Sequence, residues 1–128
     1  MNLPVAMDEY MKSTGLDRSE LHHDGELPLV FDETLRVKLV PMPDGGVALE
    51  SRVRPMPTAT GERERLVERA LKVSLGRMDT NADALTMGED REALKLQSLL
   101  RADATRSELE ACLEAHLNAL TFWRGALA

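Results

Sequence analysis

The sequence predicts an α+β fold, in which a twisted, mainly antiparallel sheet is packed by helices, and two kinds of periodicity support this. Three segments between residues 27 and 54 alternate apolar and polar side chains, as strands with one buried face do. Other segments repeat apolar side chains every three to four residues, which is typical of amphipathic helices. Together they predict the order α-β-β-β-α-β-β-α along a single domain, residues 1–128.

The first predicted helix lies at the N-terminus. Asn2 is placed to cap it, and Pro4 is tolerated in its first turn. Gly15 is placed to end it, because glycine readily adopts the left-handed conformation that closes a helix. The polar stretch 17–26 then predicts a loop.

Three strands follow, over residues 27–32, 35–40 and 47–54. The sequence Pro43-Asp44-Gly45-Gly46 separates the second from the third and is a strong hairpin signal. These strands therefore form an antiparallel meander.

The middle helix is predicted to begin after a capping Thr60 and to run to about Leu75, with Gly76 as its stop. Its apolar side chains form two neighbouring stripes rather than one. Such a wide apolar arc needs cover on two sides, from its own sheet and from something else. The side chains are Leu66, Val67, Ala70, Leu71, Val73 and Leu75.

A second hairpin is predicted around residues 88–91, and a last helix follows it. The hairpin joins a segment with Leu85 and Met87 to a segment with Leu94, Leu96 and Leu99. Thr105 and Glu108 fit a capping box at the start of the last helix. Within that helix, His116 is expected at the edge of the core.

Composition excludes several classes of function. The formal net charge of −6 and the pI near 5.1 disfavour nucleic-acid binding, because phosphate backbones repel an acidic surface. No apolar run approaches the roughly 20 residues that cross a bilayer, and no secretory signal is visible, so we expect no membrane partner. One cysteine, Cys112, suits a reducing cytoplasm.

The search for catalytic and metal-binding residues gives no site. Cys112 lies in an apolar helix, where a buried structural thiol is favoured over a nucleophile. The sequence His22-His23-Asp24, with Glu26 nearby, is favoured as a solvated loop over a metal site. We therefore predict no enzyme, no catalytic residue, no metal and no cofactor. A small enzyme that uses these same residues is the least favoured alternative.

Methionine is the one residue type that suggests a binding surface. Its flexible thioether adapts to varied apolar partners, but it also fills gaps in a core. Both interpretations stay open for the six methionines that follow Met1, which are Met7, Met11, Met42, Met56, Met78 and Met87.

Several local patterns, together with the order of elements, carry a family resemblance. They are Thr14-Gly15-Leu16, Leu29-Val30-Phe31-Asp32-Glu33, the hairpin Asp44-Gly45-Gly46, the helix 62–75, and the capped helix from Thr105 to Leu127. In these features the chain resembles the class I chaperones of bacterial type III secretion, the Tir (CesT-like) family. One departure is the lack of an asparagine near Ser74 or Gly76, where many members carry one.

The resemblance implies a function that needs no chemistry. Members are cytoplasmic bacterial homodimers that bind the N-terminal segment of a secreted effector and keep it soluble and export-competent. The ATPase of the secretion apparatus is implied as a further partner. The alternative that we keep is a non-secretory α+β regulatory or protein-binding domain of YbjN-like build.

The resemblance also implies two sets of site residues. The dimer interface lies on the middle helix and comprises Leu66, Val67, Ala70, Leu71 and Ser74. The effector groove lies on the first helix and the early strands, and its candidates are Leu3, Met7, Leu29, Phe31, Val37, Leu39, Val47 and Leu49. Alternation alone does not settle which candidates face the groove and which face the core.

Overall fold

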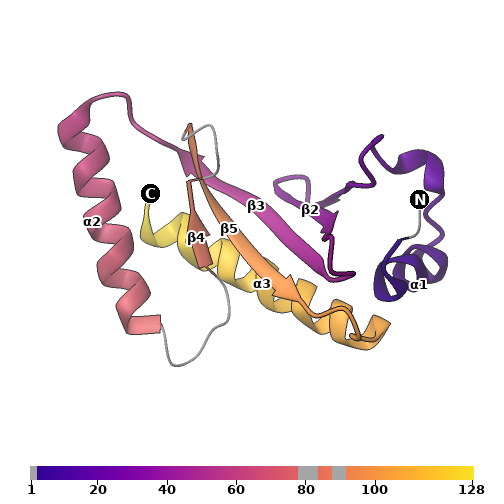
Figure 1. Ribbon diagram of the computed structural model, residues 1–128. Coiled ribbons are helices and arrows are strands. Elements are labelled where there is room, and N and C mark those ends of the chain that lie inside the picture. Colours follow the sequence, from indigo (N-terminus) through magenta and orange to yellow (C-terminus); the bar gives the residue numbers. More distant parts are fainter. Residues whose placement is uncertain (1–2, 78–83, 88–91) are drawn as a thin grey trace.

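Helices lie around a curved five-stranded sheet in the computed structural model, which describes residues 3–77, 84–87 and 92–128 (Figure 1). The predicted α+β class and element order are confirmed. The elements are α1 (Val5–Thr14), a short 3₁₀ helix η1 (Arg18–Glu20), β1 (Leu27–Phe31), β2 (Leu35–Pro41), β3 (Val47–Pro55), α2 (Thr60–Arg77), β4 (Ala84–Thr86), β5 (Ala93–Leu100) and α3 (Arg106–Ala126).

The strands lie in the order β1-β2-β3-β5-β4, and every neighbouring pair is antiparallel. The central pair is β3 with β5, which stay in register from Val47↔Leu100 to Arg52↔Lys95 before a bulge between Arg52 and Arg54. A bulge adds twist to a strand, which fits the strong curvature of the sheet.

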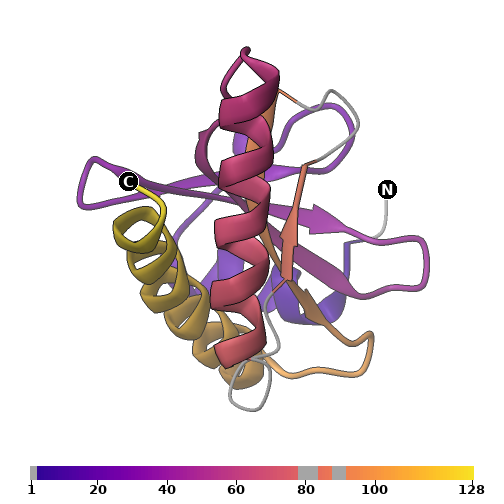
Figure 2. The same cartoon turned by 90° about the vertical axis from the view of Figure 1, so that its left-hand side faces the viewer.

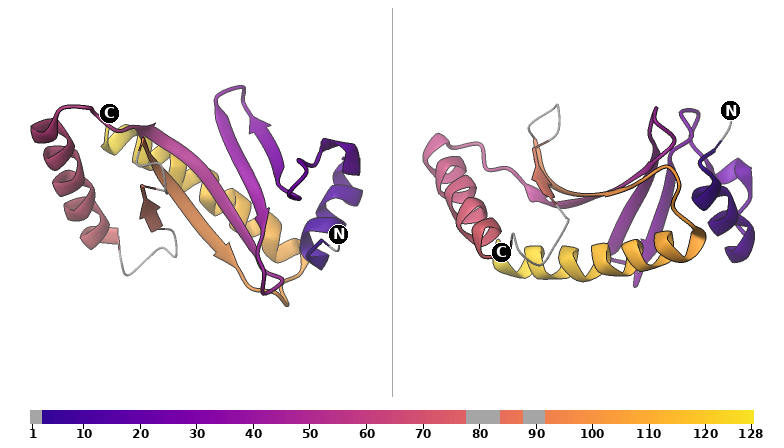
Figure 3. Two further views of the ribbon diagram at one scale, coloured as in Figure 1. Left: turned by 45° about the horizontal axis from the view of Figure 1, so that its top comes forward. Right: turned by 60° about the horizontal axis from the view of Figure 1, so that its bottom comes forward.

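The three helices divide the surroundings of the sheet between them. Helix α3 runs along one face, while α1 and α2 lie at opposite ends (Figures 1 and 3). Figure 2 shows α2 in front of the end of the sheet that is formed by β4. Among the described elements, none covers the face of the sheet opposite α3, which we call the open face.

Two clusters of buried side chains make up the core, one near each end. The first joins α1 to the early strands and the start of α3, through Ala6, Met7, Tyr10, Met11, Leu27, Val37, Leu39, Val47, Leu49, Leu109 and Leu113. The second joins α2 to β3, β5 and the end of α3, through Val53, Met56, Leu66, Ala70, Leu94, Leu96, Ala119, Leu120, Trp123 and Leu127.

Helix ends agree with the sequence in some places and correct it in others. Gly15 closes α1 in the left-handed conformation, with φ +75°, as predicted. Pro4, rather than Asn2, is the residue before the first turn of α1, and Asn2 lies outside the described residues. Helix α2 starts at Thr60 itself and continues through Gly76 to Arg77, because an exposed glycine weakens a helix without ending it.

The capping box and the first hairpin turn are confirmed. The Thr105 hydroxyl accepts from the Glu108 amide, and the Glu108 carboxylate accepts from the Thr105 amide. In the turn, the Asp44 carboxylate accepts from the amide of Gly46 at 2.8 Å. A Cβ on Gly46 would lie 2.6 Å from the Leu100 carbonyl oxygen, so only glycine fits there.

His116 corrects the prediction of a position at the core edge. It is 1% exposed, and its two ring nitrogens lie 2.8 Å from the hydroxyls of Ser51 on β3 and Ser98 on β5. These contacts satisfy a polar ring between the sheet and α3. Ser51 and Ser98 occupy inward-facing positions of the alternating strands, so the sequence indicated two polar side chains in the core. It did not indicate that both contact His116.

Candidate partner-binding surfaces

An uncovered apolar face on α2 is the first candidate surface. Leu71 and Leu75 are 61% and 70% exposed, and they lie one turn apart on the same side of the helix. Beside them, the α2 residues Val67 and Leu71 face Met56 and Met87 across an open groove of about 440 Å³. Large apolar side chains that gather in this way mark a contact surface more often than single ones do.

The predicted dimer-interface residues divide into two groups. Leu66 and Ala70 are each 7% exposed and belong to the second core cluster, so they attach α2 to its own chain. Val67 and Ser74 are half-buried and Leu71 is exposed, which leaves these three with surface for a partner. The two predicted apolar stripes of α2 therefore differ in burial: one faces the core of its own chain and the other faces outward.

The predicted effector-groove residues divide in the same way. Five of them are buried in the first core cluster and have almost no exposed surface: Met7, Val37, Leu39, Val47 and Leu49. The other three, Leu3, Leu29 and Phe31, are half-buried and pack against the rim of that cluster. A partner can reach only these three without opening the core.

The methionines also divide. Met7 and Met11 are buried in the first cluster and fill the core. Met56 and Met87 line the α2 groove, but Met56 is buried in the second core cluster, so the half-buried Met87 has the more accessible thioether. Met78 lies outside the described residues.

The histidine loop brings three possible metal ligands together without showing a site. Ligand atoms of His22, Asp24 and Glu26 all lie within 4.8 Å of one another, and His23 is not among them. Asp24 accepts from the amide of Glu26, and this bond is the main cause that lowers the pKa of Asp24. Glu26 forms an ion pair with Lys38 at 3.2 Å. These contacts account for both carboxylates within the loop and the neighbouring strand.

Cys112 has the environment of a structural thiol. Its side chain is half-buried and packs against the first core cluster. Desolvation raises the pKa of this thiol, which lowers the fraction of reactive thiolate at neutral pH.

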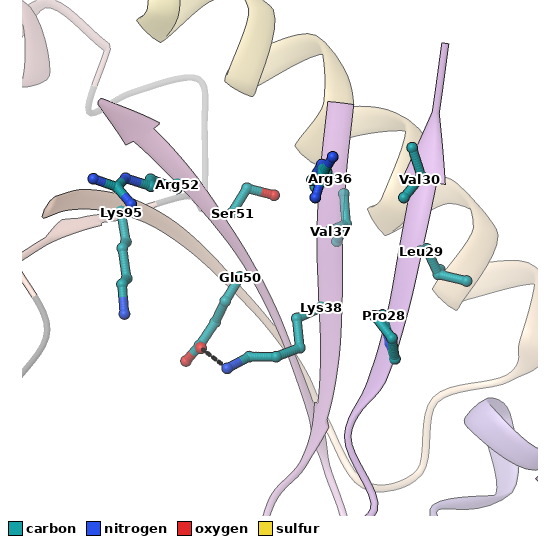
Figure 4. A pocket seen from close by; sticks show the side chains of 10 residues that line it. All are labelled: Pro28, Leu29, Val30, Arg36, Val37, Lys38, Glu50, Ser51, Arg52 and Lys95. Atoms are coloured by element: carbon teal, nitrogen blue, oxygen red, sulfur yellow. Dashed lines mark ion pairs between the residues drawn. The ribbon is translucent and has the colours of Figure 1, made fainter. Parts of the chain in front are cut away.

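A further group of residues is not predicted by the apolar alternation of the strands, because its members occupy the polar positions. On the open face, a cavity of about 280 Å³ is bordered by four cationic side chains, Arg36, Lys38, Arg52 and Lys95 (Figure 4). The signal was present in the sequence, since the polar positions of β2, β3 and β5 in this region are largely basic.

Comparison with known proteins identifies the family. The model of the Tir chaperone protein (CesT) family matches residues 6–124, from the first turn of α1 to the end of α3. The chain belongs to this family. The predicted function, a type III secretion chaperone that binds an effector, is thereby confirmed at the level of the family, and the YbjN-like alternative is not favoured. A comparison with curated protein sequences finds no match.

Single chains within several solved complexes have the same fold as this chaperone. A chain of the ExsC–ExsE complex is 22% identical, with a TM-score of 0.69 over 99% of this chain and 97% of that one. A chain of the HopA1–SchA chaperone–effector complex is 14% identical, with a TM-score of 0.69 over 94% and 91%. A chain of the structure of the Yersinia pestis type III secretion chaperone SycH, in complex with a stable fragment of YscM2, is 15% identical. Its TM-score is 0.63 over 94% of this chain and 98% of that one.

One finding bears on the predicted lack of a membrane partner. None of the helices within residues 3–77, 84–87 and 92–128 combines the length and the apolar character that crossing a bilayer requires.

Proposed function

We propose that this chaperone works as a homodimer in the bacterial cytoplasm and binds the N-terminal segment of a secreted effector in extended form. The bound segment stays soluble and ready for export. The observation that carries the proposal is the uncovered apolar face of α2. Leu71 and Leu75 are exposed side by side there, and neighbouring exposed apolar side chains are typical of a protein–protein contact surface.

The geometry of α2 suits an interface between two identical chains. In a two-fold dimer the same patch meets itself, so Leu71 of one protomer enters the groove beside α2 of its partner. The apolar part of that groove is lined by Met56, Val67, Leu71 and Met87, of which the two methionines are adaptable, and its polar part by Thr60, Arg63, Glu64 and Glu68. The buried residues Leu66 and Ala70 support the helix from behind.

The effector-binding part of the proposal rests on the rim between α1 and β1. Leu3, Leu29 and Phe31 keep part of their surface exposed there, and Val5 is 63% exposed on α1. Strand β1 is also an edge of the sheet, with β2 as its one neighbour among the described strands, and an edge strand can pair with an extended peptide. An effector segment would combine strand pairing with apolar contacts at this rim.

Binding alone performs this function, so no catalytic group is required. Each large apolar side chain that is buried contributes roughly 1.5–3 kcal/mol before ordering costs. Ordering a flexible segment costs several kcal/mol, so tight binding needs a long contact surface, which two linked protomers supply. The family resemblance further supports the ATPase of the secretion apparatus as a partner.

Two measurements test the proposal. Light scattering of the purified protein should give the mass of two chains at micromolar concentration, and a monomer would contradict the dimer. The tagged protein, isolated from its native cytoplasm, should carry one dominant partner that mass spectrometry identifies. Limited proteolysis of that complex should protect some tens of residues near the partner's N-terminus. Protection elsewhere in the partner, or no partner under secretion-permissive conditions, would overturn the effector assignment.

A further inference from the structure

Strands β2 and β3 separate part-way along their length. Their pairing runs from Pro41↔Val47 to Lys38↔Glu50 and stops there, although both strands continue. Figure 4 shows the two strands diverging beyond Glu50. Past this point Arg124 of α3 links β3 to the turn before β2, because its guanidinium donates to the carbonyl oxygens of Thr34 in that turn and Arg52 on β3, at 2.9 Å each.

The cavity on the open face lies at this divergence, and its charges are unbalanced. Arg36, Lys38, Arg52 and Lys95 border it together with one carboxylate, Glu50. We call Arg36, Arg52 and Lys95 the basic cleft. The excess of positive charge is local, since the whole chain has a formal net charge of −6.

The three cations of the basic cleft have no partner of opposite charge in the part of the chain that the structure describes. Lys38 is different, because it forms ion pairs with Glu26 at 3.2 Å and Glu50 at 3.9 Å. Arg52 and Lys95 lie directly opposite each other on β3 and β5. Like charges at such positions destabilise a sheet, so this arrangement costs stability in the free protein.

We propose that the basic cleft binds an acidic, extended stretch of a partner polypeptide. An extended chain directs alternate side chains to one side, so carboxylates at alternate positions can reach Arg36 on β2, Arg52 on β3 and Lys95 on β5. Val30, which is 58% exposed, and Pro28 offer apolar contact beside the charges. The inference rests on the proposed function in one respect, which is that the partner is the effector segment.

The test uses a defined probe. A fluorescein-labelled peptide of about 12 residues, with Glu and Thr alternating, is titrated with the purified protein at low salt, and anisotropy reports binding. A second peptide carries Gln in place of every Glu. We expect the Glu peptide to bind and the Gln peptide to bind more weakly. The combined variant Arg36→Gln, Arg52→Gln and Lys95→Gln should weaken binding of the Glu peptide roughly tenfold, since exposed ion pairs contribute modestly and three are lost.

A matched variant removes the same charge elsewhere. Lys12→Gln, Lys72→Gln and Arg106→Gln are exposed positions on α1, α2 and α3, and together they should change binding by less than about twofold. Thermal unfolding of both variants checks that they fold. Equal losses in the two variants would overturn the proposal, because general charge attraction would then explain the binding. Tighter binding of a single-stranded oligonucleotide of the same length would overturn it too.

The client found by isolation from the cytoplasm separates this proposal from the proposed function. If the basic-cleft variant retains the client with unchanged affinity, the cleft proposal fails and the proposed function stands. If it binds the client roughly tenfold more weakly while the matched variant does not, both stand. If no client exists, the proposed function fails, and the two peptides decide the chemistry of the cleft alone.

Discussion

Helices α2 and α3 are both long, 18 and 21 residues, yet the chain treats them differently. Helix α3 begins with a complete capping box and buries six side chains against the sheet, among them His116 and Trp123. Helix α2, in its described side chains, buries only Leu66 and Ala70, and it exposes Leu71 and Leu75. Helix α3 is therefore stabilised within the protomer, whereas α2 keeps apolar surface that no described part of the chain covers.

Trp123 provides the largest expected effect on the α3 side of this comparison. It is 2% exposed at the centre of the second core cluster, so Trp123→Ala should lower the free energy of unfolding by about 3–5 kcal/mol. Its neighbour Phe122 is the control, because it is 41% exposed and makes an edge-to-face contact with Trp123. Phe122→Ala should cost about 1 kcal/mol. Similar losses in urea denaturation would mean that Trp123 does not anchor α3.

Leu71→Glu tests the α2 side. The charge would be buried without a partner in a dimer but solvated in a monomer, so association should weaken roughly 100-fold or more. The fold of the protomer should remain, as circular dichroism would show. Ala111→Glu places the same charge on an exposed position of α3 and should leave the dimer intact. Light scattering over a concentration series measures both. A dimer that survives Leu71→Glu would place the interface elsewhere.

His116→Leu should have the next largest effect, about 1–3 kcal/mol of unfolding free energy, because it leaves the hydroxyls of Ser51 and Ser98 without the imidazole. Adding Ser51→Ala and Ser98→Ala removes those hydroxyls. The triple variant should therefore be more stable than His116→Leu alone, as thermal denaturation would measure. A triple variant that is less stable than the single one would show that the serines contribute through packing, not through the histidine.

Substitution of Glu108 should change stability least, and the change should depend on pH. The hydrogen bond from the Thr105 amide, followed by that from Arg101, holds the pKa of Glu108 below its ordinary value of 4.5. A lowered carboxyl pKa stabilises the fold above about pH 4.5, and this contribution is lost as the pH falls through the folded-state pKa. Glu108→Gln should therefore cost stability at pH 7 and progressively less in acid. Glu114→Gln, which removes one carboxylate at an exposed position of α3, is the charge-matched control in thermal denaturation over the same pH range.

Much of the fold was predictable because periodicity and turn chemistry act locally. The alternation in residues 27–54, the hairpin glycines and the Thr105–Glu108 capping box each depend on a few neighbouring residues. Where long-range packing decides, the prediction failed. His116 was expected at the edge of the core but lies inside it, because the hydroxyls of Ser51 and Ser98, which are distant in sequence, bind its ring there.

The binding surfaces were less predictable for the same physical reason. Apolar character does not distinguish Leu39, which is fully buried, from Leu29, which is half-buried, although both follow the same alternation. The doubled stripe on α2 did predict apolar surface that its own sheet leaves uncovered, because no single sheet can cover so wide an arc. The basic residues of the cleft were visible as polar strand positions, but their grouping was not, because no local pattern contains the register that sets Arg52 opposite Lys95.

Arg124 gives the divergence of β2 and β3 a mechanical meaning. A hydrogen-bonded ladder fixes the spacing of two strands along their whole length, but here one guanidinium sets it at a single point. Because a guanidinium is planar and its donors are fixed relative to one another, it acts as a rigid spacer between the two carbonyl oxygens. The guanidinium belongs to α3, so the side chain that bridges the opening comes from the helix on the opposite face of the sheet. Arg124 thus ties the turn before β2 and strand β3 to the same helix.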